Sequence, residues 1–199
     1  MYVLVELEDS IRIPPHLFAI SQREAISDEL NRKLANRVII NTGLCICLFD
    51  ITKIDKSFLY QSDGATHTSV EFRFVVFRPF IGEVIVGKIR SCSRDGVLVS
   101  LGFFDDILIP PHYLQDCSLF DEKEQLWYWE YESNKLFMDI GEKIRFKVKE
   151  ELFTDTSPAG PTAAANESTA LSENKRKIPY LIKGTINESG LGLISWWKE

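Results

Sequence analysis

From residue 81 onward the chain reads as a succession of short strands separated by turn residues. Asp95-Gly96 is a hairpin signal, because this dipeptide readily adopts the positive φ angles of a tight turn. Short strands at this spacing are typical of a closed or partly closed barrel. The expected strands are Glu83 to Ser91, Val97 to Leu101, Asp106 to Ile109, Leu126 to Tyr131, Glu142 to Lys149, Tyr180 to Ile186 and Leu191 to Trp197. Residues 81–199 are therefore predicted to form an all-β barrel.

Residues 1–80 follow a different pattern, with one helix among strands. Ser21 and Glu24 form a capping-box pair, with a hydroxyl and a carboxylate three residues apart. Apolar residues then recur at a spacing of four, at Ile26, Leu30, Leu34 and Val38. Such a helix packs one side on a sheet. The whole chain is therefore predicted to be α+β, a small α+β domain followed by the barrel, with the boundary near Pro79.

A segment at about residues 154–178 interrupts the barrel pattern. It is dominated by Ser, Thr, Ala, Pro and Gly and buries too little apolar surface to offset its ordering entropy. We predict that it is a disordered insertion. It ends in Lys175-Arg176-Lys177, which fits a nuclear signal or a phosphate contact and fits a solvated charge run at least as well.

Charge and apolar content limit the class of protein. The formal net charge is −6, and residues 1–80 hold 9 Lys/Arg against 10 Asp/Glu, so neither half is basic. Contact with nucleic acid must therefore use a local patch. No apolar run is long enough for a membrane span, and the first residues lack the basic region of a signal peptide. The four cysteines lack zinc-site spacing and are expected to be small buried residues in a reducing compartment, the cytosol or nucleus.

No residue set in the chain predicts an enzyme. It has no glycine loop for phosphate followed by Lys-Ser/Thr and no Gly-x-Ser-x-Gly elbow. The three histidines lie in separate segments, without partners at metal spacing. Asp105 and Asp106 are neighbours, but successive strand residues point to opposite faces and are poorly placed to share one metal ion. We therefore expect neither a cofactor nor a metal site.

A modest signal for single-stranded RNA lies in the barrel. Small β-barrels bind single strands by stacking bases on aromatic rings beside a basic groove. The candidate residues are Lys88, Arg90, Phe103, Phe104, His112, Tyr113, Arg145 and Lys147. The alternative is that the aromatic residues form the core and the basic residues cover solvated strand faces, and the residues alone do not decide between the two.

Part of the barrel region resembles the S1-type OB-fold, an RNA-binding barrel. The similar strings are Val86-Gly87-Lys88-Ile89, Gly96-Val97-Leu98-Val99 and Asp106-Ile107-Leu108-Ile109-Pro110. Val97 and Leu98 stand where such domains usually carry an aromatic residue, and such domains often carry a histidine near the position of Pro110. The resemblance therefore implies RNA contact that is weaker or that uses Phe103 and Phe104.

The chain as a whole resembles the larger stalk subunit of RNA polymerase III. The similar strings include Tyr2-Val3-Leu4-Val5, Arg12-Ile13-Pro14-Pro15, Gly43-Leu44-Cys45-Ile46-Cys47-Leu48-Phe49-Asp50-Ile51, Leu101-Gly102-Phe103-Phe104-Asp105-Asp106 and Gly190-Leu191-Gly192-Leu193-Ile194-Ser195-Trp196-Trp197. The resemblance implies a non-catalytic nuclear subunit. Its N-terminal tip domain would dock on the polymerase III core and pair with a smaller stalk subunit, and its barrel would meet nascent RNA and initiation factors.

The same resemblance suggests where the tip domain docks on the core. The candidates are Pro14, Pro15, Phe18, Gly64 and His67. Ordinary turn chemistry explains the same residues, because proline and glycine are the usual residues of turns. The alternative function for the whole chain is a free-standing S1-type protein that binds single-stranded RNA without a polymerase.

Overall fold

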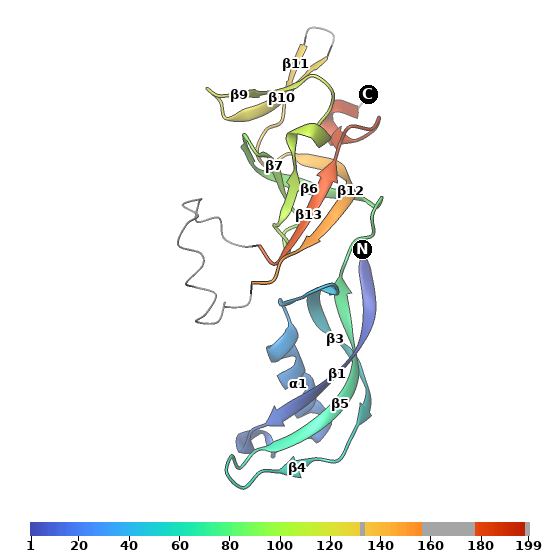
Figure 1. Cartoon of the computed structure of the whole chain (residues 1–199), viewed down its shortest axis with the longest axis vertical. Coiled ribbons are helices and arrows are strands. Elements are labelled where there is room, and N and C mark those ends of the chain that lie inside the picture. Colours follow the sequence, from blue (N-terminus) through green and yellow to red (C-terminus); the bar gives the residue numbers. More distant parts are fainter. Residues whose placement is uncertain (132–133, 157–177, 198–199) are drawn as a thin grey trace, which may run out of the picture. The chain divides into compact units, whose positions relative to one another are not determined.

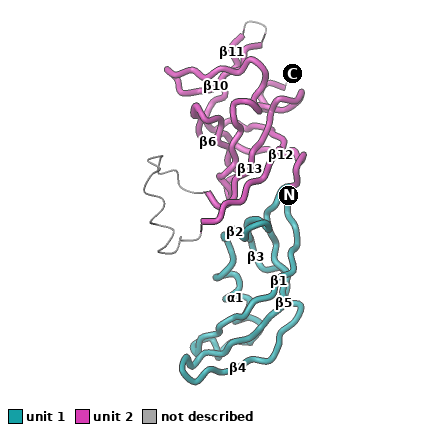
Figure 2. Tube along the Cα trace, in the orientation of Figure 1, with its two compact units in different colours: residues 1–79 teal, residues 80–199 magenta. Residues whose placement is uncertain are grey.

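The computed structural model describes residues 1–131, 134–156 and 178–197. The chain divides into two compact units, Met1–Pro79 and Phe80–Glu199, which Figure 2 colours separately. Most of the segment expected to be disordered, including Lys175-Arg176-Lys177, lies outside the described residues.

The first unit is one helix on an antiparallel sheet. Its elements are β1 (Tyr2–Ile13), the 3-10 turn η1 (Pro15–Leu17), α1 (Gln22–Leu34), β2 (Val38–Ile39), β3 (Gly43–Ile54), β4 (Phe58–Leu59) and β5 (Thr66–Phe77). The strand order is β1-β5-β3-β2, with β4 also paired to β5. Figure 1 shows α1 lying along one face of this sheet. Strand β1 has a strand partner on one edge only among the described residues.

Helix α1 begins at the predicted cap, Ser21. The Ser21 hydroxyl accepts a hydrogen bond from the backbone N–H of Glu24 at 3.3 Å, which satisfies one of the donors that a helix start leaves open. Ile26 and Leu30 are fully buried against the sheet. The prediction was wrong for Val38, which lies in β2. The chain leaves the helix after Leu34 and turns at Asn36, whose φ of 59° no helix accommodates.

Alternation along β5 builds the core of this unit. Val70, Phe72, Phe74 and Val76 are each at most 1% exposed and face α1. In the neighbouring strand β3, a bulge between Cys45 and Cys47 breaks the alternation of buried and exposed residues. Cys45 is therefore buried while Cys47 is exposed. The expectation that all four cysteines are buried was thus wrong, and Cys117 is exposed as well.

The second unit contains a closed five-stranded barrel. Its strands are β6 (Val84–Ser93), β7 (Gly96–Ser100), β8 (Ile107–Ile109), β12 (Lys143–Phe153) and β13 (Tyr180–Thr185). They run in the order β13-β8-β7-β6-β12, and β12 pairs with β13 to close the ring. Gly96 enters β7 with a φ of +134°, and a Cβ there would lie 2.2 Å from the Ile109 carbonyl oxygen, so the hairpin requires glycine. The predicted α+β class, a small tip domain and a barrel, is confirmed.

Two features of this unit differ from the prediction. A separate three-stranded sheet combines β9 (Ser118–Asp121), β10 (Leu126–Tyr131) and β11 (Asn134–Phe137), of which only β10 was expected. The last expected strand was wrong, because only β14 (Gly192–Leu193) is extended and the 3-10 turn η3 (Ile194–Trp197) follows. A second short turn, η2 (Pro111–Tyr113), follows β8. Gly192 has a φ of +105°, and a Cβ there would lie 2.6 Å from the Trp196 ring, so this position requires glycine.

Candidate nucleic-acid interface and docking surfaces

A row of basic side chains lies on the outer faces of β6 and β12. In the antiparallel register Lys88 stands opposite Lys143, and the neighbouring pairs place Arg145 beside Val86 and Lys147 beside Val84. Lys88 and Lys143 line a cavity of about 410 Å³ together with residues 100–102. Like charges directly across a sheet repel, so an anion in this cavity would relieve that repulsion.

Ion pairing decides which of these cations are available. Arg90 pairs with Asp105 at 2.9 Å and Lys147 with Glu188 at 2.8 Å. Arg145 donates to the Gly190 carbonyl oxygen at 3.2 Å. Neither Lys88 nor Lys143 forms an ion pair with any residue that the structure describes, so these two are the best placed of the row to contact phosphate.

Sequence reasoning omitted Lys143 from the candidate set, although the signal was present. The alternation that singled out Arg145 and Lys147 also includes Lys143, two residues earlier on the same face of β12. What the sequence does not contain is the register, which sets Lys143 directly across from Lys88.

The aromatic candidates do not gather beside these lysines. Phe103 is 43% exposed and follows Gly102, which lines the cavity. Phe104 is only 5% exposed and packs on Tyr180, with ring centroids 5.5 Å apart, so it belongs to the barrel core. The structure thus keeps one exposed ring near the basic row and places the other in the core.

His112 and Tyr113 lie in η2, beside β8 and β13. The centroids of their rings lie 4.2 Å apart. The Tyr113 hydroxyl donates to Glu150 at 2.7 Å, which raises the pKa of Tyr113. Lys183 also donates to Glu150, at 2.9 Å, and lowers the pKa of that carboxyl. This paired, partly acidic setting is a poor place for a phosphate.

Another aromatic group lies on the three-stranded sheet and was not predicted. Trp129 contacts Tyr131 at 4.9 Å and Trp196 at 5.3 Å between ring centroids. Trp127 is buried, and its indole N–H donates to the Ser93 carbonyl oxygen at 2.7 Å, which ties β10 to β6. The run Leu126-Trp127-Tyr128-Trp129 is the sequence signal for this group.

The predicted docking residues gather at one end of the first unit. A Cβ at Gly64 would lie 3.9 Å from Pro15, and Pro14 accepts the backbone N–H of Leu17, so the proline turn and the glycine loop are neighbours. Phe18 is 50% exposed and lines a cavity of about 280 Å³ with Ile20 and Thr66. We call this end the tip cluster, defined as Pro14, Pro15, Phe18, Ile20, Phe58, Leu59, Tyr60, Gly64 and His67.

A small ionic network fixes the loop of the tip cluster. Arg12 donates to both carboxylate oxygens of Asp63, at 2.8 and 2.5 Å, and the His67 ring lies 3.1 Å from the same carboxylate. The Arg12 guanidinium first, and His67 second, hold the pKa of Asp63 well below its ordinary value. The Tyr60 ring contacts His67 edge to face at 4.8 Å.

Sequence reasoning missed Phe58, Leu59 and Tyr60, which are 65%, 62% and 55% exposed. Pairing of β4 with β5 sets Phe58 opposite His67 and brings this apolar run into the tip cluster. The signal was three apolar residues directly before the turn residues 61–64.

A second set of exposed apolar residues in the first unit lies on β1 and β3, outside the tip cluster. Tyr2, Leu4 and Phe49 are 53%, 47% and 57% exposed, and we call these three residues the junction set. The second unit carries exposed apolar residues of its own, at Phe80, Ile81, Val84 and Val86. Apolar exposure of this extent is typical of a surface that another protein covers.

The described residues contain no group of three or more His, Cys, Asp and Glu side chains arranged to hold a metal ion. Within the same residues, no helix is both long and apolar enough to cross a membrane.

Comparisons with known proteins agree across the chain. Residues 83–197 match the family model of RNA polymerase III subunit Rpc25, and residues 8–64 match the SHS2 domain found in the N terminus of Rpb7p and Rpc25p. A Bos taurus protein named DNA-directed RNA polymerase III subunit RPC8 is 55% identical over 99% of this chain and 98% of its own length. The Saccharomyces cerevisiae protein of that name is 38% identical over the full length of both chains.

A relative from another polymerase matches this chain less closely. The Saccharomyces cerevisiae DNA-directed RNA polymerase II subunit RPB7 is 25% identical over 75% of this chain and 86% of its own length. The match to polymerase III proteins is thus both stronger and more complete, and the chain belongs to the family of RNA polymerase III subunit Rpc25.

Proposed function

We propose that this chain is the larger, non-catalytic subunit of the RNA polymerase III stalk and acts in the nucleus. The observation that carries the proposal is 55% identity, over nearly the whole of both chains, to a polymerase III subunit. A free-standing RNA-binding protein would share the barrel without the N-terminal unit, whereas here the similarity extends through both units.

The tip cluster is proposed to dock on the polymerase core. It combines a cavity with exposed aromatic rings, which supply large contact area at low entropic cost and are enriched in protein interfaces. The Arg12–Asp63–His67 network holds the Gly64 loop beside Pro15 before any partner arrives. Such pre-ordering lowers the cost of binding.

The junction set is proposed to bind the smaller stalk subunit. Its three residues, all in the first unit, are aliphatic or aromatic, as in long-lived protein complexes. A partner that covered them would bury apolar surface at about 25 cal/mol per Å².

RNA contact is proposed to run along the basic row of β6 and β12. Lys88 and Lys143 would contact phosphates first, and Arg145 and Lys147 would join them by exchanging their present partners. Phe103 is the ring best exposed for stacking beside the row. Initiation factors would meet other faces of the same unit.

Immunodepletion tests the proposed function. A nuclear extract depleted of this chain should lose transcription from a polymerase III template, and the purified chain with its smaller partner should restore it. Transcription from a polymerase II template in the same extract is the control and should not change. Equal loss on both templates, or no loss on either, would refute the assignment.

Salt dependence tests the RNA proposal. For single strands the logarithm of the binding constant falls with the logarithm of salt by about 0.7 for each phosphate neutralised. The double change Lys88→Ala and Lys143→Ala should therefore flatten the slope for oligouridylate by about 1.4. Arg94→Ala, at an exposed cation paired with Glu122 outside the row, is the control. A slope that is equal in both variants would remove the basic row from the RNA interface.

A further inference from the structure

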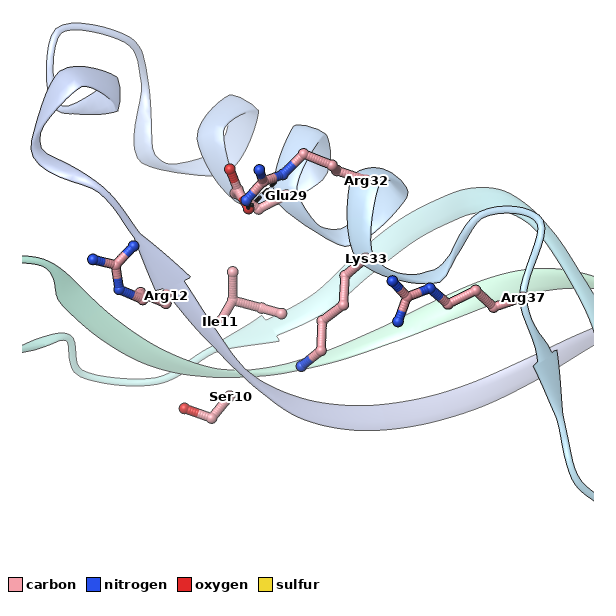
Figure 3. Close-up of a pocket in the computed structure, with 7 residues that line it drawn as sticks. All are labelled: Ser10, Ile11, Arg12, Glu29, Arg32, Lys33 and Arg37. Atoms are coloured by element: carbon pink, nitrogen blue, oxygen red, sulfur yellow. Dashed lines mark hydrogen bonds and ion pairs between the residues drawn. The ribbon is translucent and has the colours of Figure 1, made fainter. Parts of the chain in front are cut away.

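A groove lies between β1 and α1 in the first unit, and its lining shares no residue with the cavity of the tip cluster. It has a volume of about 410 Å³ and is lined by Ser10, Ile11, Arg12, Glu29, Arg32, Lys33 and Arg37. Figure 3 shows Arg32 and Lys33 extending from α1, Arg37 from the segment after it and Arg12 from β1. Neither the basic row nor the junction set includes any of these residues.

The lining of this groove carries four basic side chains and the carboxylate of Glu29. Arg12 pairs with Asp63 and Lys33 with Asp9, which leaves Arg32 and Arg37 as the cations to consider for a ligand. Arg32 pairs with Glu29 at 2.5 Å but is 76% exposed, and exposed pairs of this kind exchange partners at little cost. Arg37 forms no ion pair with any described residue, so all five of its guanidinium donors remain for a ligand.

The floor of the groove offers backbone groups as well as charge. The backbone N–H of Ser10 points to the open edge, where it donates to its neighbour Asp9 at 2.8 Å. Because antiparallel residues alternate between bonding their partner strand and pointing away, the backbone groups of Arg12 share that edge. An unpaired strand edge is a template for one further strand.

Asp9 already shows how a carboxylate sits at this edge. One of its oxygens accepts the Ser10 N–H at 2.8 Å, and the other accepts from Lys33 at 2.5 Å. Its carboxylate is held between a backbone N–H at the strand edge and a cation from α1. An acidic side chain of a ligand would make the same pair of contacts. The Asp9 carboxylate thus occupies the position at this strand edge that a carboxylate of a bound ligand would take.

We propose that this groove binds an acidic peptide segment of another protein in extended conformation, beside β1. Carboxylates of the segment pair with Arg32 and Arg37 while its backbone bonds to the edge at Ser10 and Arg12. A nucleic acid satisfies the charges but cannot pair with a strand edge, so the two features together favour a peptide. Arg12 also belongs to the ionic network that fixes the tip-cluster loop, but no residue of the tip cluster, the junction set or the basic row lines this groove.

Fluorescence anisotropy with a labelled ten-residue peptide tests this site. The peptide alternates glutamate with valine, and the same scaffold with lysine in place of glutamate is the control ligand. The full chain should bind only the acidic peptide, and hydrogen exchange at the Ser10 and Arg12 amides should slow in the complex. Asp9→Ala should strengthen binding, because it removes the competing carboxylate.

Charge reversal supplies the decisive variants. Arg37→Glu should weaken binding of the acidic peptide about tenfold or more, and the milder Arg37→Gln should weaken it less. Arg94→Glu makes the same charge change at an exposed residue of the second unit and should leave binding unchanged. Equal loss in Arg37→Glu and Arg94→Glu, or unaltered exchange at Ser10 and Arg12, would overturn the proposal. So would oligouridylate RNA protecting these amides while the acidic peptide does not.

Discussion

Asp63 connects the strand β1 to the loop of the tip cluster. Its carboxylate accepts two hydrogen bonds from Arg12 and lies within hydrogen-bond distance of His67. The depressed pKa of Asp63 means that the folded state favours its ionised form. The network therefore stabilises the folded tip above the ordinary pKa of an aspartate, and this contribution is lost as pH falls towards the lower folded value.

Asp63→Asn should lower the thermal stability of the chain near neutral pH, because the ion pair with Arg12 is lost. The difference in Tm from the unsubstituted chain should shrink as pH falls below about 4, where Asp63 becomes protonated in the unfolded chain. Melting curves between about pH 7 and about pH 3 measure this. Asp116→Asn, at an exposed carboxylate of the second unit, is the control. A Tm difference that stays constant with pH would contradict the proposed role of the network.

Individual residues also show what a sequence alone could predict of the candidate sites. Phe103 and Phe104 are adjacent and chemically identical, yet one is exposed and the other lies in the core. Phe104 is buried because it packs on Tyr180, a residue of the distant strand β13, and no local pattern in the sequence predicts that contact. The alternation of residues along β12 was enough to predict that Lys143 belongs to the basic row. Its position opposite Lys88 depends on strand register, which the sequence does not give.

At the scale of elements, α1 owes its start to Ser21. Ser21→Ala should destabilise the chain by about 0.5–2 kcal/mol, since the N–H of Glu24 loses its capping oxygen. Urea unfolding measures this change. Ser27→Ala is the matched control, because that hydroxyl donates back to the Arg23 carbonyl oxygen within the helix and alanine is the better helix former there. If both substitutions cost the same, the cap does not stabilise the helix.

Sequence signals that act within a few residues predicted their elements correctly. They failed for elements that form only by packing against distant parts of the chain. The Ser21 cap and the Asp95-Gly96 hairpin act over a few residues, and both were predicted. Strands β9 and β11 were missed because each has only four residues and forms by pairing with β10. Trp127 then fixes that sheet to the barrel through Ser93, a contact between distant segments.

At the scale of the whole molecule, the junction set is the surface proposed to bind the smaller stalk subunit. Leu4→Asp should weaken the complex with the smaller stalk subunit about tenfold, because a half-exposed leucine contributes about 1–2 kcal/mol when an interface buries it. Calorimetric titration of the purified chains measures the affinity. Leu119→Asp is the matched control, since Leu119 is 50% exposed on β9 and lies outside the junction set. An unchanged affinity for Leu4→Asp would move the partner to another surface.

Affinity purification of the tagged full chain from nuclear extract, followed by quantitative mass spectrometry, tests the central claim most directly. The proposed function predicts recovery of the polymerase III subunits together with a small stalk partner in a ratio close to one to one. Recovery of RNA and ribosomal proteins without polymerase subunits would contradict it and would make the barrel a free-standing RNA-binding module.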